Sequence, residues 1–269
     1  MLLAQITDLH VALPGTLLDS RYRTSEHLQR AVAHLLGLDP APDAVVITGD
    51  LVDAGSATEY ERLVELLAPL TAPVYVIPGN HDEREAMRAA FGPRGYLPAE
   101  GFLCYAVDLG ALRLVALDTN VPGEPGGALC AARLAWLDAC LAGAPDRPTV
   151  VVLHHPPFTT GIEQMDGMGL VGADGLAEVI GRHGHVERVL CGHVHRPITR
   201  RFAGTVAVAC PGTAHQIALD LRHPGGLAIV REPPACMLHV WSEQTGLVSH
   251  MSYVDPRAEI DVIYPPRPG

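Results

Sequence analysis

The sequence predicts an α/β fold. Short apolar runs that end in Gly, Asp or His alternate with segments of helical periodicity, which is the pattern of successive strand–loop–helix units. The composition, with 48% hydrophobic and 18% charged residues, is typical of a folded chain rather than a disordered one. With 269 residues the chain is long enough for one large core, so one domain is the starting expectation.

Strands and helices alternate in the first two thirds of the chain. Apolar runs predict the strands, and the segments of helical periodicity between them predict the helices. The predicted strands comprise residues 2–6, 44–48, 74–77, 149–153 and 186–191. The predicted helices comprise residues 25–36, 58–67, 131–141 and 175–182. Two more apolar runs, 102–107 and 112–117, flank Gly110 and predict a β-hairpin.

The chain after Arg196 is mostly β in character. Its apolar runs predict strands at residues 205–209, 216–219, 227–230, 237–241 and 247–253. The last two are joined by a turn at Thr245-Gly246, and this many strands favours two packed sheets. The Pro-rich end, Tyr264–Gly269, has no periodicity and is expected to be loose.

Charge and residue usage exclude several function classes. All 19 cationic side chains are Arg, so Schiff-base lysines and Walker-type phosphate loops are excluded. The net charge of −11 argues against electrostatic capture of nucleic acid polymers or anionic membranes. The six Cys residues lie far apart without a Cys-x-x-Cys pair, and we expect reduced thiols. Because no signal peptide or membrane-spanning run is evident, the expected location is cytoplasmic.

Five predicted strands are followed by side chains that bind metals well. Each motif alone is more often a turn residue with a surface imidazole. However, α/β folds build their sites at the carboxyl ends of strands, and five such ends together predict a metal site. The motifs are Asp8-x-His10, Gly49-Asp50, Gly79-Asn80-His81, His154-His155 and Gly192-His193-Val194-His195.

The donor set predicts two metal ions. Oxygen and nitrogen donors without sulfur suit two divalent or mixed-valence ions of Fe, Mn, Zn or Co. Seven side chains exceed the three or four protein ligands of one catalytic zinc, and Asp50 is the best candidate for a carboxylate that bridges two ions. The seven candidate ligands are Asp8, His10, Asp50, Asn80, His154, His193 and His195.

The charge balance of such a site predicts its substrate class. Two divalent ions carry four positive charges, Asp8 and Asp50 cancel two, and a metal-bound hydroxide cancels one, which leaves about +1. Asn80 is neutral where a third carboxylate would cancel this charge. The site is therefore expected to attract an anionic phosphoester and to hydrolyse it by attack of the hydroxide. A serine nucleophile is not needed, and the sequence has no Gly-x-Ser-x-Gly element.

At these residues the sequence resembles the calcineurin-like metallophosphoesterases. Their pattern of Asp-x-His, Gly-Asp-x-x-Asp-x-Gly, Gly-Asn-His, His and Gly-His-x-His is present in order within residues 1–221. The resemblance implies two sheets flanked by helices, an α/β/β/α sandwich. We take residues 1–233 as the catalytic domain and residues 234–269 as a β-rich C-terminal extension that contributes to oligomerisation. The resemblance also implies one metal held by Asp8, His10, Asp50 and His195, and the other by Asp50, Asn80, His154 and His193.

Two further residues are catalytic candidates. The resemblance implies that His81 contacts the phosphate and assists the leaving group. Asp53, the second Asp of the Gly-Asp-x-x-Asp-x-Gly motif, is a candidate to orient the His81 imidazole, with a turn residue before a helix as the alternative. His155 either supports the site or fills the turn before Pro156-Pro157.

Within this superfamily, segments 154–158, 192–196 and 211–216 look like those of bacterial class III cyclic nucleotide phosphodiesterases and glycerophosphodiester phosphodiesterases. In such relatives a His equivalent to His215 and the loop after the fourth strand lie near the substrate. Here His215 is alternatively a structural histidine, and Met165 and Met168 are alternatively packing residues. The loop runs through Phe158, Thr159, Met165, Asp166 and Met168. The substrate-binding candidates are Asn80, His81, His195 and His215.

The expected function is metal-dependent hydrolysis of a small phosphodiester, either a 3′,5′-cyclic nucleotide or a glycerophosphodiester. The nearest alternative is a phosphomonoesterase or nucleotide hydrolase, for which Arg196, Arg200 and Arg201 would supply extra cations if they point inward; otherwise they form a solvated strand face. The acidic charge disfavours a nuclease, and the complete ligand set disfavours a non-catalytic scaffold. Besides substrate, the expected partner is a second copy of the chain in a homodimer or higher homo-oligomer, with no nucleic acid polymer and no membrane.

Overall fold

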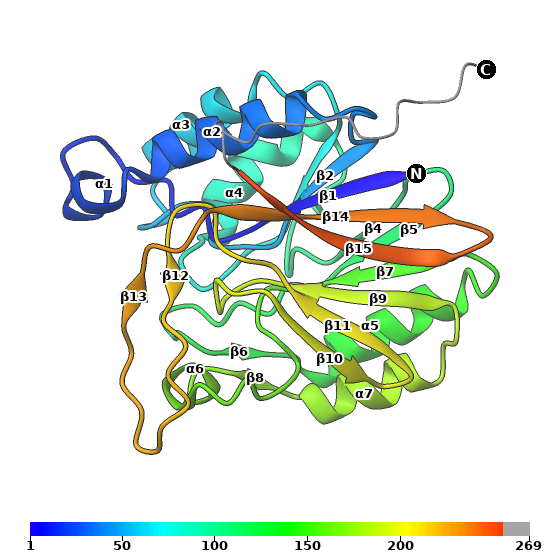
Figure 1. The fold of residues 1–269 in the computed structure, drawn as a ribbon. Helices are drawn as coiled ribbons and strands as arrows, with labels where there is room; N and C mark the ends of the chain where they lie inside the picture. Colours follow the sequence, from blue (N-terminus) through cyan, green and yellow to red (C-terminus); the bar gives the residue numbers. More distant parts are fainter. Residues whose placement is uncertain (255–269) are drawn as a thin grey trace, which may run out of the picture.

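Two β-sheets packed face to face form the centre of the molecule, and helices cover both outer faces (Figure 1). The computed structural model describes residues 1–254. The first sheet has the strand order β15 (Gly246–Tyr253), β14 (Ala235–Ser242), β1 (Leu2–Ile6), β2 (Ala44–Ile47) and β3 (Val74–Val76). The second has the order β10 (Ile198–Phe202), β11 (Thr205–Ala209), β9 (Val186–Cys191), β7 (Thr149–Val152), β5 (Arg113–Ala116) and β4 (Tyr105–Asp108).

The helices form two outer layers. Three of them, α2 (Thr24–Leu36), α3 (Ala57–Leu67) and α4 (Arg84–Phe91), pack on the first sheet, whereas α5 (Ala131–Ala142) and α7 (Ala173–Gly181) pack on the second. This arrangement confirms the predicted α/β/β/α sandwich. The short elements are α1 (Leu17–Tyr22), η1 (Gly92–Arg94), α6 (Glu163–Asp166) and the two-stranded ribbons β6 (Gly127–Ala128) with β8 (Leu170–Val171) and β12 (Gln216–Ile217) with β13 (Ile229–Val230).

Strand β1 packs against other layers of the molecule on both of its faces. Leu3 packs in the cluster between the two sheets, and Ala4 and Ile6 pack in the cluster under the helices. A strand buried on both faces reads as a continuous apolar run because successive side chains point to opposite faces. The sequence therefore identified this strand by its hydrophobicity and not by a polar–apolar alternation.

The parallel pairing brings the carboxyl ends of the central strands to one edge. In the first sheet β1, β2 and β3 run parallel, and in the second β5, β7, β9 and β11 do. The loops that leave β1, β2, β3, β7 and β9 therefore meet at the same edge of the sandwich. This is where α/β folds place functional side chains.

Some predicted elements are confirmed, and others differ in the structure. The hairpin around Gly110 is confirmed as β4 and β5, and the turn at Thr245-Gly246 joins β14 to β15 as predicted. Helix α1 was not predicted because none of its residues is buried, and a helix without a buried face has no apolar periodicity. The predicted strands 216–219 and 227–230 shorten to β12 and β13.

The part of the predicted C-terminal extension that the structure describes is continuous with the first sheet. Strand β14 pairs antiparallel with β1, with Leu3 opposite His239. The division at residue 233 thus remains a prediction, and it falls between β13 and β14. The loose end predicted for Tyr264–Gly269 lies outside the described residues.

None of the helices within residues 1–254 has the length and apolar character needed to cross a membrane.

A buried polar network links the C-terminal hairpin to the space between the sheets. Gln5 donates from Nε2 to Thr48 Oγ1 at 2.9 Å and to the Cys191 carbonyl at 3.0 Å, so its Oε1 is free to accept. His239 donates to that oxygen from Nε2 at 3.1 Å and accepts from the Ser249 hydroxyl at Nδ1, 2.8 Å away. The neutral imidazole satisfies both contacts. Burial lowers the pKa of His239 to about 3.

We expect His239 to make the fold less stable in mild acid. An unfolded histidine takes up a proton near pH 6.5, but the folded one stays neutral. The contribution of His239 to the free energy of unfolding is therefore present above pH 6.5 and is lost as pH falls towards 3. For metal-free protein in urea, the stability gap between wild type and His239→Gln should therefore narrow by about 2 kcal/mol from pH 6.5 to pH 5. The exposed His250→Gln is the matched control, and a gap independent of pH would contradict the neutral assignment.

Candidate metal centre

All seven predicted ligands lie on loops at the shared edge of the two sheets. Asp8 and His10 follow β1, Asp50 follows β2, and backbone bonds from Asp8 N to the Gly49 carbonyl and from His10 N to the Asp50 carbonyl join the two loops. The structure thus brings together residues that are far apart in the sequence. The others are Asn80 after β3, His154 after β7, and His193 and His195 after β9.

The backbone at the ligands is locally strained. Among the described residues, seven other than glycine have positive φ, and five of these seven are predicted ligands. Such conformations are disfavoured for residues with a Cβ atom and persist where the surrounding structure requires them. The five are Asp8, His10, Asp50, His193 and His195.

Two glycines allow the loops to approach closely. A Cβ atom at Gly49 would lie 2.3 Å from His154 Nδ1, and Gly49 itself has φ +94°. A Cβ atom at Gly192 would lie 2.1 Å from Thr7 Oγ1. These contacts give the physical reason for glycine directly before Asp50 and His193, because any larger residue would push the ligand loops apart.

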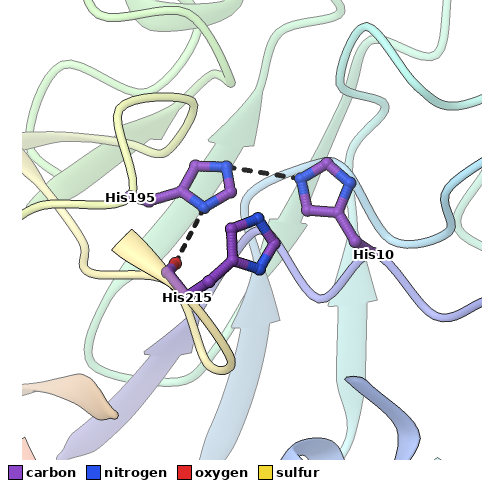
Figure 2. Close-up of side chains that lie close together, drawn as sticks. All are labelled: His10, His195 and His215. Carbon is purple, nitrogen blue, oxygen red and sulfur yellow. Dashed lines mark hydrogen bonds between the residues drawn. The ribbon is translucent and has the colours of Figure 1, made fainter. Parts of the chain in front are cut away.

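The first group of donors comprises Asp8, His10, Asp50 and His195, and all four are buried. The Nε2 atoms of His10 and His195 lie 3.3 Å apart (Figure 2). His195 Nε2 is 3.4 Å from Asp8 Oδ1, and His10 Nε2 is 3.5 Å from Asp50 Oδ2. Donors bound to one ion at about 2.1 Å in a tetrahedron lie about 3.4 Å apart, so the spacing fits a shared cation.

The second group comprises Asn80, His154, His193 and again Asp50. Asn80 Oδ1 lies 3.2 Å from His154 Nε2 and 3.1 Å from His193 Nδ1. His154 Nε2 is also 3.4 Å from Asp50 Oδ2. The same oxygen of Asp50 therefore faces both groups, as a bridging carboxylate must.

The electrostatics of the two carboxylates also fit cations. Burial raises the pKa of Asp8 above its usual value, although His195 and His154 act against it. Burial would likewise raise the pKa of Asp50, but His154 and His10 outweigh this and hold it well below the usual range. Two carboxylates buried this closely require nearby positive charge, and divalent ions supply it.

Backbone carbonyls orient three of the imidazoles. His154 donates from Nδ1 to the Thr48 carbonyl at 2.8 Å, and His195 donates from Nδ1 to the His215 carbonyl at 3.0 Å (Figure 2). His193 donates from Nε2 to the Met168 carbonyl at 3.1 Å. In each ring the remaining nitrogen is left as an acceptor that points into the centre, which is how proteins prepare a histidine for a metal.

Asp53 lies between two imidazoles. His81 donates from Nδ1 to the backbone carbonyl of Asp53 at 2.7 Å, whereas the Asp53 carboxylate is 3.6 Å from both His81 Nδ1 and His10 Nδ1. The carbonyl therefore orients His81. Among the described residues, buried His10 Nδ1 has no hydrogen-bond partner, and the Asp53 carboxylate, 3.6 Å away, faces its N–H.

We therefore expect Asp53→Asn to weaken metal binding, and to leave the orientation of the His81 ring largely unchanged because the backbone carbonyl that holds it remains. Loss of a carboxylate behind a ligand histidine typically costs 10–100-fold in metal affinity. Competition with a coloured chelator measures that loss, with Asp138→Asn as an exposed carboxylate control. Unchanged affinity together with a large loss of rate would instead support the predicted role of the carboxylate in orienting His81.

His155 and His215 differ in their surroundings. His155 Nδ1 accepts from the Thr119 hydroxyl at 2.8 Å and its Nε2 donates to the Pro125 carbonyl at 3.2 Å, so neither nitrogen is free for a metal. Burial lowers the pKa of His155 to about 3, which keeps it neutral. The His215 ring instead packs against His195 and His10, with ring centroids 4.8 and 5.4 Å apart. Within residues 1–254, His215 Nδ1 has no hydrogen-bond partner.

The loop predicted to lie near the substrate has mostly structural contacts. Met165 is buried in the core, the Met168 carbonyl holds His193, and Asp166 accepts from Thr160 N and Gly161 N. Of the three arginines considered for a monoester, Arg196 binds Glu232 and the Ile217 carbonyl. Arg200 and Arg201 are exposed on β10 and line a cavity of about 630 Å³ that the candidate ligand His193 also lines.

The sequence analysis missed two residues that shape the centre. Asp82 Oδ2 accepts from Gly79 N at 2.8 Å and from Leu51 N at 3.1 Å, which ties the Asn80 loop to the Asp50 loop. Asn120 donates from Nδ2 to the carbonyls of Gly79 and Asp82. The segment 118–120 directly follows β5, so the strand-end pattern that identified the ligands was present there too.

Comparison with known proteins agrees with this geometry. A model of the calcineurin-like phosphoesterase family matches residues 1–197. A probable glycerophosphodiester phosphodiesterase of Arcobacter nitrofigilis is 35% identical over 255 residues, which cover 94% of this chain and 93% of that protein. A probable cyclic nucleotide phosphodiesterase of Rhodopseudomonas palustris is 38% identical over 248 residues, which cover 91% and 89%.

Among solved structures, a dimetal phosphatase from Danio rerio has a TM-score of 0.63 at 14% identity, covering 95% of this chain and 99% of that one. This likeness concerns the fold alone. The family match spans most of the chain, and the curated relatives extend over nearly its whole length. The chain therefore belongs to the calcineurin-like phosphoesterase family.

Proposed function

We propose that this protein hydrolyses a small phosphodiester, a 3′,5′-cyclic nucleotide or a glycerophosphodiester, with two bound metal ions. The observation that carries the proposal is the position of Asp50 Oδ2, which lies 3.5 Å from His10 Nε2 in one donor group and 3.4 Å from His154 Nε2 in the other. One carboxylate oxygen shared by two donor groups is the arrangement of a dinuclear site. The relatives named for the two substrate classes support both.

The ions supply Lewis acidity that activates water and stabilises charge on the phosphoryl oxygens when they are bound. We propose two ions of Fe, Mn, Zn or Co, because the donors are imidazole nitrogens and carboxylate or amide oxygens without sulfur. Asn80 contributes a neutral oxygen and thereby leaves the site with net positive charge for an anionic diester. His215 packs on His195, a member of the first donor group, and we propose that both contact the substrate together with Asn80.

His81 is proposed to bind the phosphate and to protonate the leaving group. Its side chain is 39% exposed, whereas the ligand imidazoles are nearly fully buried. Nδ1 is fixed by the Asp53 carbonyl, so Nε2 is the nitrogen available to substrate. His81 N also donates to Asp50 Oδ1 at 2.9 Å, which fixes the residue relative to the bridging carboxylate.

We also propose a homodimer or higher homo-oligomer in the cytoplasm. Strand β15 is the edge strand of its sheet and exposes Val248, Met251 and Tyr253, an arrangement that favours association. All six cysteines are free thiols, as in a reducing compartment. Light scattering at micromolar concentration tests the oligomer, and a monomer there would contradict it.

The test of the function is an activity assay after metal removal. Protein stripped with a chelator should be inactive towards bis-p-nitrophenyl phosphate and should regain turnover with added Mn, Zn, Co or Fe. A side-by-side panel of cyclic AMP, glycerophosphocholine and p-nitrophenyl phosphate then separates the diester classes from a monoesterase. Failure of every metal to restore turnover would point to a non-catalytic scaffold, and a preference for the monoester would reject the diester assignment.

A further inference from the structure

A second cavity, of about 700 Å³, lies beside the metal centre. One aromatic layer separates the two. The Tyr22 ring packs on the His215 ring with centroids 4.8 Å apart, and His215 in turn packs on His195, a predicted ligand, also at 4.8 Å. A molecule with its phosphate at the metal centre would have to extend across the His215 and Tyr22 rings to reach this cavity.

The cavity is strongly cationic in a chain whose net charge is −11. Four arginines line it, Arg21, Arg23, Arg30 and Arg231, beside one carboxylate, Glu232, which is paired with Arg196. Glu26 contacts Arg23 and Arg30, but within residues 1–254 neither Arg21 nor Arg231 has a carboxylate partner. No carboxylate of the described residues neutralises these two charges.

Tyr22 holds the two unpaired arginines together. The guanidinium carbons of Arg21 and Arg231 lie 5.4 and 5.7 Å from the centroid of its ring, within the range of cation–π contacts. Arg231 also donates from Nη2 to the Arg21 carbonyl at 2.7 Å. Planar guanidinium groups fixed in this way are suited to bind a phosphate through paired hydrogen bonds.

Helix α1, which carries Arg21 and Tyr22, has no core-packing role. It buries none of its residues and projects from the body of the molecule (Figure 1). The helix ends at Tyr22. The next residue, Arg23, lines the cavity and has φ +51°, a conformation that is disfavoured for residues with a Cβ atom. Burial lowers the pKa of His27 in the wall, and Arg30 lowers it further, as expected in a positive potential.

We propose that this cavity binds a second phosphate group of the substrate, so that the enzyme prefers phosphodiesters carrying a phosphate monoester in addition to the scissile bond. The inference rests on the proposed function and specifies its substrate class. Arg21 and Arg231 bind the second phosphate, and Tyr22 positions them. The scissile phosphate occupies the metal centre, and the linker crosses His215.

The test compares two pairs of substrates that differ by one phosphate. Glycerophosphoinositol 4-phosphate is compared with glycerophosphoinositol, and the dinucleotide pTpT with TpT, so that the pairs separate a polyol source from a nucleotide source. For metal-loaded wild type we expect kcat/KM to be about tenfold higher for the phosphorylated member of at least one pair, mainly through KM. Arg21→Gln combined with Arg231→Gln should abolish this preference. Both side chains are exposed, so the core is unaffected.

The control is Arg62→Gln combined with Arg182→Gln, which removes two surface arginines away from the cavity and should keep the preference. Equal kcat/KM within both pairs in wild type, or a preference that survives in the cavity variant, would overturn the inference while turnover of bis-p-nitrophenyl phosphate leaves the proposed function intact. Absence of turnover for every diester would reject the proposed function and this selectivity with it.

Discussion

Asp50→Asn is expected to abolish metal-dependent turnover, with a loss of at least about 1,000-fold. Asp50 Oδ2 faces both donor groups, and Oδ1 accepts from His81 N. An amide in this position has a neutral oxygen, and its NH2 group has no lone pair available to bind a cation. The variant should therefore lose the shared ligand, the fixed charge between the two groups and the position of His81 in one step.

The readouts for Asp50→Asn separate metal loss from misfolding. Bound metal measured by elemental analysis should fall below two ions per chain, and added metal should raise the thermal midpoint less than in wild type. The metal-free forms should have similar midpoints, because the substitution keeps the shape of the side chain. Asp138→Asn, an exposed carboxylate on α5, is the matched control. Wild-type turnover with two bound ions in Asp50→Asn would contradict the bridging role.

His81→Ala is expected to keep both metals and to lose about 10²–10⁴-fold in rate on a natural diester. The side chain is not among the predicted ligands and is the partly exposed imidazole beside them. If it protonates the leaving group, the loss depends on how much protonation that group needs. The loss should be large for glycerophosphocholine or cyclic AMP, whose leaving groups are alkoxides, and smaller for bis-p-nitrophenyl phosphate, whose leaving group is already a stable phenolate.

This dependence on the leaving group distinguishes proton transfer from simple phosphate binding. A loss of equal size on all substrates would show that His81 positions the phosphate, and unchanged rates would move proton transfer to another group. Exposed His250→Ala serves as the control for removal of an imidazole. Metal content should stay at the wild-type level in both variants.

The fold, and a set of candidate ligands that the structure brings together, could be predicted from the sequence for one physical reason. Parallel strands buried on both faces read as short apolar runs, and their carboxyl ends meet at one edge, so a ligand after each run implies a common site. Asp8, Asp50 and His154 are predicted ligands of this kind, and the structure places them at the same edge although more than 100 residues separate the first and last. The bridging position predicted for Asp50 agrees with its distances to His10 and His154.

Other features depend on geometry that the sequence does not carry. Positive φ at the ligands is not a property of Asp or His as residue types, and only the folded chain imposes it. The atom of Asp53 that orients His81 is a backbone carbonyl, which side-chain chemistry cannot predict. Helix α1 has no buried face that would predict it. The cavity lined by Arg21 and Arg231 forms only in the folded chain, because more than 200 residues separate the two.

Metal titration of the stripped protein tests the dinuclear assignment most directly. Mn²⁺ or Zn²⁺ is added stepwise, and bound metal per chain is measured together with turnover of bis-p-nitrophenyl phosphate. We predict saturation at two ions per chain, with activity that tracks occupancy of the second site. Full activity with one ion per chain, or turnover by protein from which all metal has been removed, would contradict the dinuclear centre.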